Sequence, residues 1–597
     1  MFWITYLYVK KLLFLMDLQA IGNADDVYSK KEEFDFYDKI IEYVLKEAPS
    51  KGDLAKEKVR LCREFKMRKV PSDIEIFLNA PKEKLNSLRS CLQTKPMRTG
   101  SGVAVVAIMT APFKCPHGKC TYCPGGPKSY FGDVPQSYTG NEPATMRGIR
   151  NDYDAYLQVM NRLEQYVVIG QNPDKVELII MGGTFPSYSY EYQEEFARDS
   201  FQAMNDFSEL FFEGDGRGLD KFNIEKFKDF FELPGDINDP DRNSKIKAKL
   251  LALKKKNKCT LLEAQKVNET ARIRCIGMTI ETKPDWALLE HGNNMLSLGC
   301  TRVELGIQTL FDNVLAETHR GHDIFHSMES VKILKDLGFK LNFHMMPGLP
   351  GVSREEDIWC YKELFDNQAY RPDMLKIYPT MVMPGTKLYL DYKQGKYLPL
   401  STDQAADIIS EMVKFVPSYC RIMRVQRDIP TKHSRGGVDK NNLRQLVDGR
   451  MADKGYSLND IKAKEIGSNK IKDPVHINVK AYDSSDSKDY FISVDDSNGY
   501  LLGFARLRIV KEARRDEFST NSAIIRELHV YGSAIAIGED SDKTQHRGFG
   551  KKLMKKAELL ARDHGCEKML VISGVGVREY YKRLGYSLEG PYMVKSL

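Results

Sequence analysis

Three cysteines near residue 120 have the spacing of ligands to a single metal centre. The segment CPHGKCTYC places Cys115, Cys120 and Cys123 directly after the apolar run VAVVAIM, and three neighbouring thiolates favour a soft metal. Zinc with His117 as fourth ligand, or three unrelated thiols, are alternatives. Structural zinc usually draws on two separated cysteine pairs, and the next cysteine is Cys259. The pattern therefore favours a [4Fe-4S] cluster with one iron open to a ligand.

A second site is predicted near the C-terminus. The segment QHRGFGKKLMKKAELLAR has a glycine-rich turn that opens a helix, where successive backbone N–H groups can bind a pyrophosphate. The strand IIRELHV precedes it, and the strand KMLVIS and the helix REYYKRLG follow. This order predicts a small α+β domain that binds a phosphate-containing cofactor.

Between the two sites, apolar runs alternate with helical segments. Each run ends in glycine, proline or polar residues: VAVVAIM, VELIIMGG, RIRCIGMTIETKPD, CTRVELGIQ, KLNFHMMPGLPG and MLKIYPTMVMPG. Such a series predicts a parallel sheet buried on both faces, in a partial or full barrel. Ligands of these folds bind at the carboxyl ends of the strands.

The length of 597 residues predicts several domains. We expect an N-terminal helical domain (1–97), a barrel (98–398) with a surface insertion (211–258), a connecting region (399–479) and the C-terminal α+β domain (480–597). A basic run in the first domain, which includes Arg60, Arg63 and Lys66, is either a solvated helix face or a contact with nucleic acid.

Composition excludes several classes of protein. The net charge of +7 suits a polyanionic partner without requiring one. Eleven sparse cysteines indicate a reducing compartment, so we expect a cytoplasmic protein. Lys10 and Lys11 interrupt the apolar N-terminal segment, so neither piece can span a membrane, and the pattern of a signal peptide is missing.

Tyr122 before the last cysteine, and the loop position at the start of a β/α barrel, resemble the radical-SAM superfamily, whose usual spacing CxxxCxxC is one residue shorter. The motifs CPHGKCTYCPGGP, QSYTGNEPATMRGIR, VELIIMGGTF, TIETKPDW, CTRVELGIQ, HMMPGLP, LKIYPT and RVQRDIP together resemble the catalytic subunit of Elongator. The resemblance implies an α/β protein: a radical-SAM partial β/α barrel with an N-terminal helical domain and a C-terminal α+β GNAT domain.

The resemblance also implies the cofactors: a [4Fe-4S] cluster, S-adenosylmethionine (SAM) and acetyl-CoA. At the strand ends, the backbone of Gly182, Gly183 and Thr184 is expected to approach the amino group of SAM. Lys283, Glu304 and Gln308 are expected at the same ligand, although each residue has an equally good structural explanation.

In GNAT folds a splayed strand presents its backbone to pantetheine, which predicts the set Glu527, Leu528, His529 and Val530. The pyrophosphate is expected at Gln545, Gly548, Phe549, Gly550 and Lys551. Tyr581, or else Tyr580, is expected to face the acetyl thioester as the catalytic residue. Lys175 is expected to reach acetyl-CoA from the barrel.

Three functions follow as alternatives. The resemblance implies that a deoxyadenosyl radical takes hydrogen from the acetyl methyl, that the carbon adds to C5 of uridine 34 in tRNA, and that hydrolysis leaves 5-carboxymethyluridine. This enzyme needs an electron donor, and the resemblance leaves accessory subunits open. The second alternative is a protein lysine acetyltransferase with a structural cluster, in which Glu527 or His529 is the general base. The third is a tRNA-binding scaffold with inert sites.

A basic segment between the two cofactor sites is either a solvated surface or, given its place between those sites, a binding surface for an anticodon loop. It supplies seven cations: Arg421, Arg424, Arg427, Lys432, Arg435, Lys440 and Arg444.

Overall fold

The computed structural model of the chain describes residues 24–67, 69–93, 102–214, 222–235, 239–467, 469–519, 521–531 and 548–597. The chain divides into two compact units. Unit 1 comprises residues 1–98, 164–172 and 213–246, and unit 2 comprises the rest. The predicted pyrophosphate ligand Gln545 lies outside the described residues.

Unit 1 is helical, as expected of its N-terminal part. Its helices are α2 (Ala24–Glu47), α3 (Lys51–Glu64), α4 (Asp73–Leu78), α5 (Leu85–Leu92) and α9 (Ile224–Phe230), together with the start of α10 (Pro240–Lys256). Phe36, Ile40, Ile76 and Leu88 are completely buried in the core of α2 to α5. Helices α9 and α10 lie in the segment that was expected to be a surface insertion.

The basic run of α3 is largely paired within the protein. Arg60 forms ion pairs with Glu57 at 2.7 Å and with Glu64 at 2.8 Å. Arg63 and Lys66 are exposed. The pairing of Arg60 is what a solvated helix face would show.

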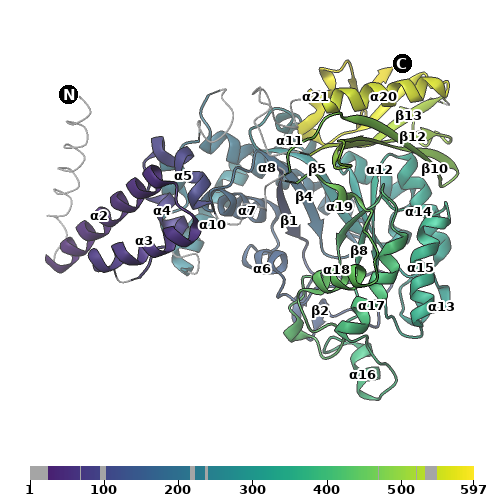
Figure 1. Cartoon of the computed structure of the whole chain (residues 1–597), viewed down its shortest axis with the longest axis horizontal. Coiled ribbons are helices and arrows are strands. Elements are labelled where there is room, and N and C mark those ends of the chain that lie inside the picture. The colour runs from purple at the N-terminus through teal and green to yellow at the C-terminus, as the bar shows by residue number, and fades with distance from the viewer. Residues whose placement is uncertain are drawn as a thin grey trace. The chain divides into compact units, whose positions relative to one another are not determined.

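In unit 2, seven parallel strands form the predicted partial barrel (Figure 1). They follow chain order: β1 (Ala104–Met109), β4 (Lys175–Met181), β5 (Arg274–Thr282), β6 (Arg302–Gln308), β7 (Lys340–Met345), β8 (Met374–Ile377) and β9 (Arg421–Arg424). No ladder joins the edge strands β1 and β9 in the part of the chain that is described. Six strands lie in the six predicted apolar runs, and β9 lies within the expected connecting region.

Helices connect and cover these strands. They are α6 (Pro143–Arg150), α7 (Ala155–Val168), α8 (Tyr190–Phe211), α11 (Leu261–Asn268), α12 (Leu289–Ser297), α13 (Asp312–Glu317), α14 (Ile324–Asp336), α15 (Arg354–Asp366), α16 (Lys387–Lys393), α17 (Thr402–Met412), α18 (Leu443–Asp453) and α19 (Ile461–Lys464). Capping boxes at Thr260, Ser353 and Ser401 begin α11, α15 and α17. The hairpin β2 (Gly126–Ser129) and β3 (Gly132–Val134) follows the cysteine segment.

The two faces of the barrel sheet differ in polarity. On β4, Val176, Leu178 and Ile180 are completely buried, while Lys175 and Glu177 occupy the alternate positions and are partly exposed. Parallel pairing places successive charged residues on the second, inner face of the sheet. The sequence predicted a sheet buried on both faces, and the inner face of this sheet carries charged side chains.

The C-terminal domain is a second seven-stranded sheet, in the order β10 (His476–Ser484), β11 (Ser487–Asp495), β12 (Leu501–Val510), β13 (Ser522–Val530), β14 (Lys568–Ile572), β16 (Tyr592–Ser596) and β15 (Ser587–Glu589). Its helices are α20 (Phe549–Asp563) and α21 (Arg578–Lys582). Helix α20 packs against β11, β12 and β13 (Figure 1). The predicted strands and helices of this domain are all present.

This domain packs against the amino-terminal ends of the barrel strands. Arg526 of β13 donates to both carboxylate oxygens of Asp373, which directly precedes β8, at 2.6 and 2.7 Å. Gly574 lies so close to β5 that a Cβ there would be 2.1 Å from the carbonyl oxygen of Ile276. The cysteine segment follows β1 at the opposite, carboxyl end of the sheet. The two predicted cofactor sites therefore lie at opposite ends of one set of strands.

None of the helices that the structure describes is long and apolar enough to cross a membrane.

Candidate functional site

The cysteine segment forms a compact loop at the carboxyl end of β1. Cys120 and Cys123 are buried, and the Ser137 amide donates to the Cys123 sulfur at 3.3 Å. Burial raises the pKa of Cys115 to about 12, and Cys123 and Cys120 oppose its ionisation further. Three thiolates this close together need a cationic centre among them. No fourth cysteine interacts with these three in the described part of the chain.

Two basic side chains lie beside Cys120. His117 Nε2 is 3.3 Å from its sulfur, and an Arg320 Nη is 3.7 Å away. Burial lowers the pKa of His117 to about 3, and Lys283 and Arg320 lower it further, so the ring is neutral. The position of His117 agrees with the zinc alternative as well as with a cluster.

Several buried polar atoms around this loop have no hydrogen-bond partner in the part of the chain that the structure describes. They are His117 Nδ1, Thr121 Oγ1, Tyr122 Oη, Gln308 Oε1, Arg320 Nε and both ring nitrogens of His322. Buried polar groups are normally paired, because an unpaired one costs about 1–3 kcal/mol. The concentration of unpaired atoms next to three thiols is what a bound metal cluster and a polar ligand would satisfy, so the donor set fits both.

The glycine pair predicted to approach SAM is at the carboxyl end of β4. Gly182 has φ 135°, and a Cβ there would lie 2.0 Å from Thr110 Oγ1. Packing alone therefore requires glycine at this position. Gly183 has φ 104° and lies against Gln136. Thr184 is buried directly after them.

Lys283 and Gln308 lie at the same end of the sheet, and Glu304 lies in the middle of β6. Lys283 is buried with its ammonium 3.2 Å from Asp285 Oδ2. Gln308 has a left-handed φ of 73°, and its buried Oε1 has no hydrogen-bond partner among the described residues. Glu304 is different, because protein groups already surround its carboxylate.

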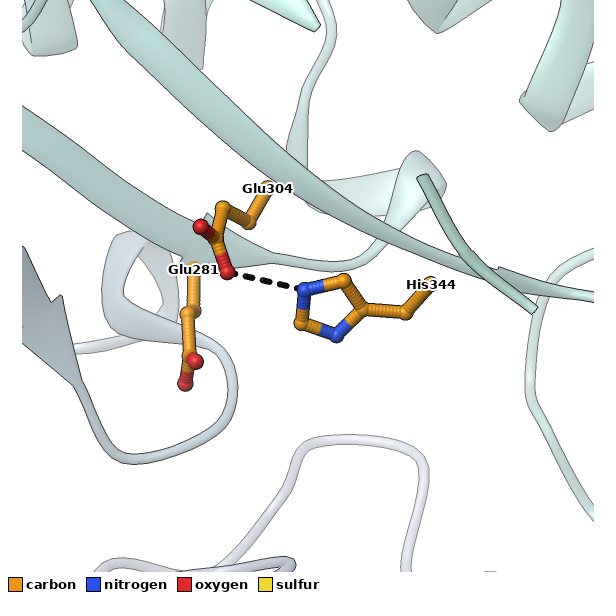
Figure 2. A group of neighbouring side chains, drawn as sticks. All are labelled: Glu281, Glu304 and His344. Atoms are coloured by element: carbon orange, nitrogen blue, oxygen red, sulfur yellow. Dashed lines mark hydrogen bonds and ion pairs between the residues drawn. The ribbon is translucent and has the colours of Figure 1, made fainter. Parts of the chain in front are cut away.

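Glu304 belongs to a cluster that sequence reasoning missed (Figure 2). Glu281, Glu304 and His344 project from β5, β6 and β7, with ligand atoms all within 4.8 Å of one another. The Lys376 ammonium from β8 contacts Glu304. Glu281 accepts from Tyr138 Oη at 3.0 Å. The available signal was polar residues at alternate positions of otherwise apolar strands.

The predicted acetyl-CoA strand is splayed. Pairing of β13 with β14 ends at Ile525, so Glu527, Leu528, His529 and Val530 pair only with β12 in the described ladders. A β-bulge at Arg526 produces this divergence and turns its side chain to Asp373. Backbone groups of the four predicted residues therefore remain available along one edge of the strand, as the pantetheine prediction requires.

The side chains of this strand are also constrained. Burial opposes ionisation of Glu527, but Lys340 and Arg506 outweigh it and hold its pKa below the ordinary value. Arg506 donates to this carboxylate at 2.8 Å. Burial lowers the pKa of His529 to about 4. An ion-paired Glu527 is a poor general base for lysine acetylation.

The glycine-rich turn begins α20. Gly548 is its N-cap with φ 71°, Phe549 is buried and Lys551 is exposed. At Gly550 a Cβ would lie 2.7 Å from Tyr580 Oη, so the Tyr580 hydroxyl lies beside the helix N-terminus. The ring of Tyr581 is buried.

Tyr580 is thus the predicted tyrosine beside this turn, and the buried ring of Tyr581 packs edge-on against the ring of Tyr580 with ring centroids 5.2 Å apart. Lys175 is the first residue of β4, at the end of the sheet where the C-terminal domain packs.

Known families cover most of the chain. Residues 35–100 match the ELP3 N-terminal domain, 237–359 the radical SAM superfamily, 372–453 the radical SAM C-terminal domain and 460–586 the acetyltransferase (GNAT) family. The tRNA uridine(34) acetyltransferase of Methanocaldococcus infernus is 41% identical over 94% of this chain and 98% of its own length. Elongator complex protein 3 of Homo sapiens is 39% identical over 91% and 93%.

A solved structure agrees. The archaeal Methanocaldococcus infernus Elp3 with an N-terminal deletion matches with a TM-score of 0.66 and 35% sequence identity, over 83% of this chain and all of that chain.

These matches confirm the predicted fold and cofactors. The radical-SAM part uses a [4Fe-4S] cluster and SAM, and the GNAT part uses acetyl-CoA, so the chain is an acyltransferase with two cofactor sites. The three close cysteines are the candidate ligands of this cluster, and their assignment to it remains a prediction because the radical-SAM match begins at residue 237. On this evidence, the chain belongs to the family of tRNA uridine(34) acetyltransferases and Elongator complex protein 3.

Proposed function

We propose that this enzyme carboxymethylates the wobble uridine 34 of tRNA to 5-carboxymethyluridine, with acetyl-CoA as carbon source and SAM as radical source. The tRNA substrate is suggested by the name of its relative from Methanocaldococcus infernus. The observation that carries the proposal is a continuous row of charged residues on the inner face of the barrel. It extends from Glu527 on the acetyl-CoA strand through Arg302 to Glu304.

The row begins at the C-terminal domain. Arg302 Nη2 is 2.5 Å from Glu177 Oε1. Burial opposes the charge of Arg302, but Glu177, Glu304 and Glu527 outweigh it and hold its pKa above the ordinary value. One guanidinium therefore lies in the field of Glu527 on the acetyl-CoA strand and of Glu304 near the cysteine loop.

The row suits an acetyl unit that must reach the other cofactor. The seven residues of β6 span roughly 23 Å. The acetyl-CoA site and the cysteine loop, at opposite ends of such strands, are therefore not in direct contact. Reaction requires the acetyl methyl close to the 5′ carbon of SAM. We infer that the acetyl group approaches along the inner face, past Lys175 and Arg302.

Each part of the site has a role in this scheme. Cys115, Cys120 and Cys123 would hold the cluster, which together with bound SAM would supply the radical chemistry needed at the acetyl methyl. Gln308 and the backbone of Gly183 orient SAM. The edge of Glu527 to Val530 and the N-terminus of α20 hold acetyl-CoA, with Tyr581 or Tyr580 beside the thioester.

The predicted tRNA-binding segment is only partly available. Arg421 contacts Glu465 and Arg424 contacts Asp428. Arg427 donates to the carbonyl of Ser137. Lys432, Arg435 and Lys440 are exposed, so we assign contact with tRNA phosphates to these three cations. We place the reaction in the cytoplasm because the eleven cysteines are sparse and unevenly spaced along the chain.

Deuterated acetyl-CoA tests the scheme. Anaerobic reaction with SAM, reductant and tRNA should give deuterium in 5′-deoxyadenosine and 5-carboxymethyluridine in the RNA. The Cys123→Ser variant should lose both while it still binds acetyl-CoA, because Cys123 belongs to the other site. Unlabelled deoxyadenosine in the parent, together with undiminished lysine acetylation by Cys123→Ser, would support the lysine acetyltransferase instead.

A further inference from the structure

Glu304 in the middle of β6 and His344 near the carboxyl end of β7 form a carboxylate–imidazole pair (Figure 2). His344 Nε2 lies 2.8 Å from Glu304 Oε2, and Asn342 Nδ2 donates to the other oxygen at 3.1 Å. Burial opposes ionisation of Glu304, but Lys376 and His344 outweigh it and keep its pKa well below the ordinary value. Glu304 is therefore an ionised acceptor that holds the proton of His344 on Nε2.

The other ring nitrogen of His344 is free. Nδ1 has no hydrogen-bond partner in the described part of the chain. It is also not completely buried, unlike the other unpaired polar atoms near the cysteine loop. The side chain of His344 is 15% exposed. Burial lowers the pKa of His344, so the ring is neutral near pH 7. A neutral ring with Nε2–H directed to a carboxylate leaves a lone pair on an accessible Nδ1.

The cluster is less suited to a metal ion. Glu281, Glu304 and His344 could each offer one ligand atom, but donors already occupy the carboxylates. Tyr138 Oη and the Gly182 amide donate to Glu281, at 3.0 and 3.3 Å. An ion at Glu304 would have to displace the Lys376 ammonium. This arrangement fits acid–base chemistry better than metal binding.

The pair lies next to the cysteine loop. Tyr138, which donates to Glu281, follows Ser137, whose amide donates to the Cys123 sulfur. The free Nδ1 is thus at the end of the barrel where the proposed reaction joins the acetyl carbon to uridine. That product is still a CoA thioester, and its conversion to a carboxylate requires water.

We propose that His344 is the general base that activates water to hydrolyse this uridine–CoA thioester. Nδ1 accepts a proton from water as the water oxygen bonds to the thioester carbonyl carbon. The carbon–sulfur bond then breaks, and the departing CoA sulfur takes the proton from the imidazolium. The products are the carboxymethyl group, which ionises to release one proton, and CoA thiol. No electron is transferred, and Glu304 acts as a positioning residue. This inference rests on the proposed function.

His344→Gln tests the proposal. Glutamine can still hydrogen-bond to Glu304 but cannot accept the proton, and loss of a general base lowers a rate by about 10²- to 10⁴-fold. The variant should form labelled 5′-deoxyadenosine as the parent does in a single turnover. Its tRNA should carry uridine still joined to CoA, detected by mass spectrometry of nuclease digests. Hydroxylamine should release the CoA and leave a hydroxamate.

The matched control is His326→Gln. His326 Nδ1 forms a similar pair with Asp323 at 2.6 Å, but this pair lies at the start of α14 and its imidazole side chain is 39% exposed. This variant should yield 5-carboxymethyluridine and free CoA at the parental rate. Glu304→Gln should accumulate the same thioester as His344→Gln, because it loosens the imidazole. Iron content and circular dichroism would show that all variants are folded.

Other outcomes would overturn the assignment. Free 5-carboxymethyluridine from His344→Gln at the parental rate would show that another base acts. A parallel fall in SAM binding, deoxyadenosine and product would show that His344 is a SAM contact. A different result would contradict the proposed function itself: the parent enzyme would form neither labelled 5′-deoxyadenosine nor a modified uridine.

Discussion

Burial changes the chemistry of single side chains in this protein. Asp357 of α15 is 7% exposed, and its carboxylate accepts the Gly348 amide at 2.8 Å. Burial raises the pKa of Asp357 to about 7, and Glu356 raises it further. The folded protein thus binds this proton more tightly than the unfolded chain, whose aspartates titrate near pH 4. This group therefore reduces the free energy of unfolding as pH rises from about 4 to 7.

Asp357→Asn should remove this dependence, because asparagine keeps an acceptor for Gly348 without a charge. The variant should gain stability over the parent by up to about 1.4 kcal/mol per pH unit between pH 4 and 7, and the gain should level off above pH 7. Urea unfolding at several pH values measures this difference in the free energy of unfolding between variant and parent. Asp366→Asn, at an exposed position of the same helix, should differ from the parent by less than about 0.5 kcal/mol at each pH. A gain that is independent of pH would contradict the assignment.

At the scale of elements, the start of α20 is built for a phosphate-bearing ligand. Gly548 adopts a left-handed φ of 71°, after which the helix presents its first backbone N–H groups. Beside it the edge of β13 has lost its pairing with β14. A helix N-terminus and an open strand edge together provide donors for the pyrophosphate and the pantetheine amides of acetyl-CoA.

Gly548→Val should therefore weaken acetyl-CoA binding at least about tenfold. A β-branched side chain is strained in the left-handed region by about 1–2 kcal/mol, and the turn would shift. Calorimetric titration with acetyl-CoA measures binding, and the iron content should remain that of the parent.

Gly565→Val is the matched control. Gly565 follows the other end of α20 with φ 72°, and no atom lies within 4 Å of a Cβ built there. The Gly565→Val variant should have the same backbone strain as Gly548→Val but should keep the acetyl-CoA affinity of the parent. Equal loss of affinity in both variants would show that general destabilisation, not the turn, is responsible.

At the scale of the molecule, buried ion pairs join the C-terminal domain to the barrel. Asp373 is completely buried and accepts from Arg526 at 2.6 and 2.7 Å. Arg508 similarly bridges Asp336 of the barrel at 2.7 Å and Asp489 of its own domain at 2.9 Å. These buried charges favour one arrangement of the two domains, because separating the domains would leave the carboxylates and guanidinium groups buried without partners. We expect barrel and C-terminal domain to unfold together.

Arg526→Met should lower the stability of both domains by about 3–5 kcal/mol, because it leaves Asp373 without its bidentate partner. Differential scanning calorimetry should show one transition for unit 2 in the parent, displaced to lower temperature in the variant. Arg583→Met, at an exposed position of the same domain, should leave the transition in place. Two separate transitions in the parent, one of them unaffected by Arg526→Met, would show that the domains are independent.

The sequence by itself determined the features whose signals are local. Cys115, Cys120 and Cys123 lie within nine residues, and their chemistry can be read from spacing. The turn at Gly548 and six of the seven barrel strands are likewise encoded in short runs, since burial under helices requires continuous apolar faces.

Only the tertiary structure determined which distant polar residues meet. Glu281, Glu304, His344 and Lys376 come from four strands, and parallel pairing brings them to one end of the inner face. The opposite placement of the two cofactor sites depends on contacts such as Arg526 with Asp373, which are 153 residues apart. Such pairings arise from sheet register and domain packing, which local composition does not specify.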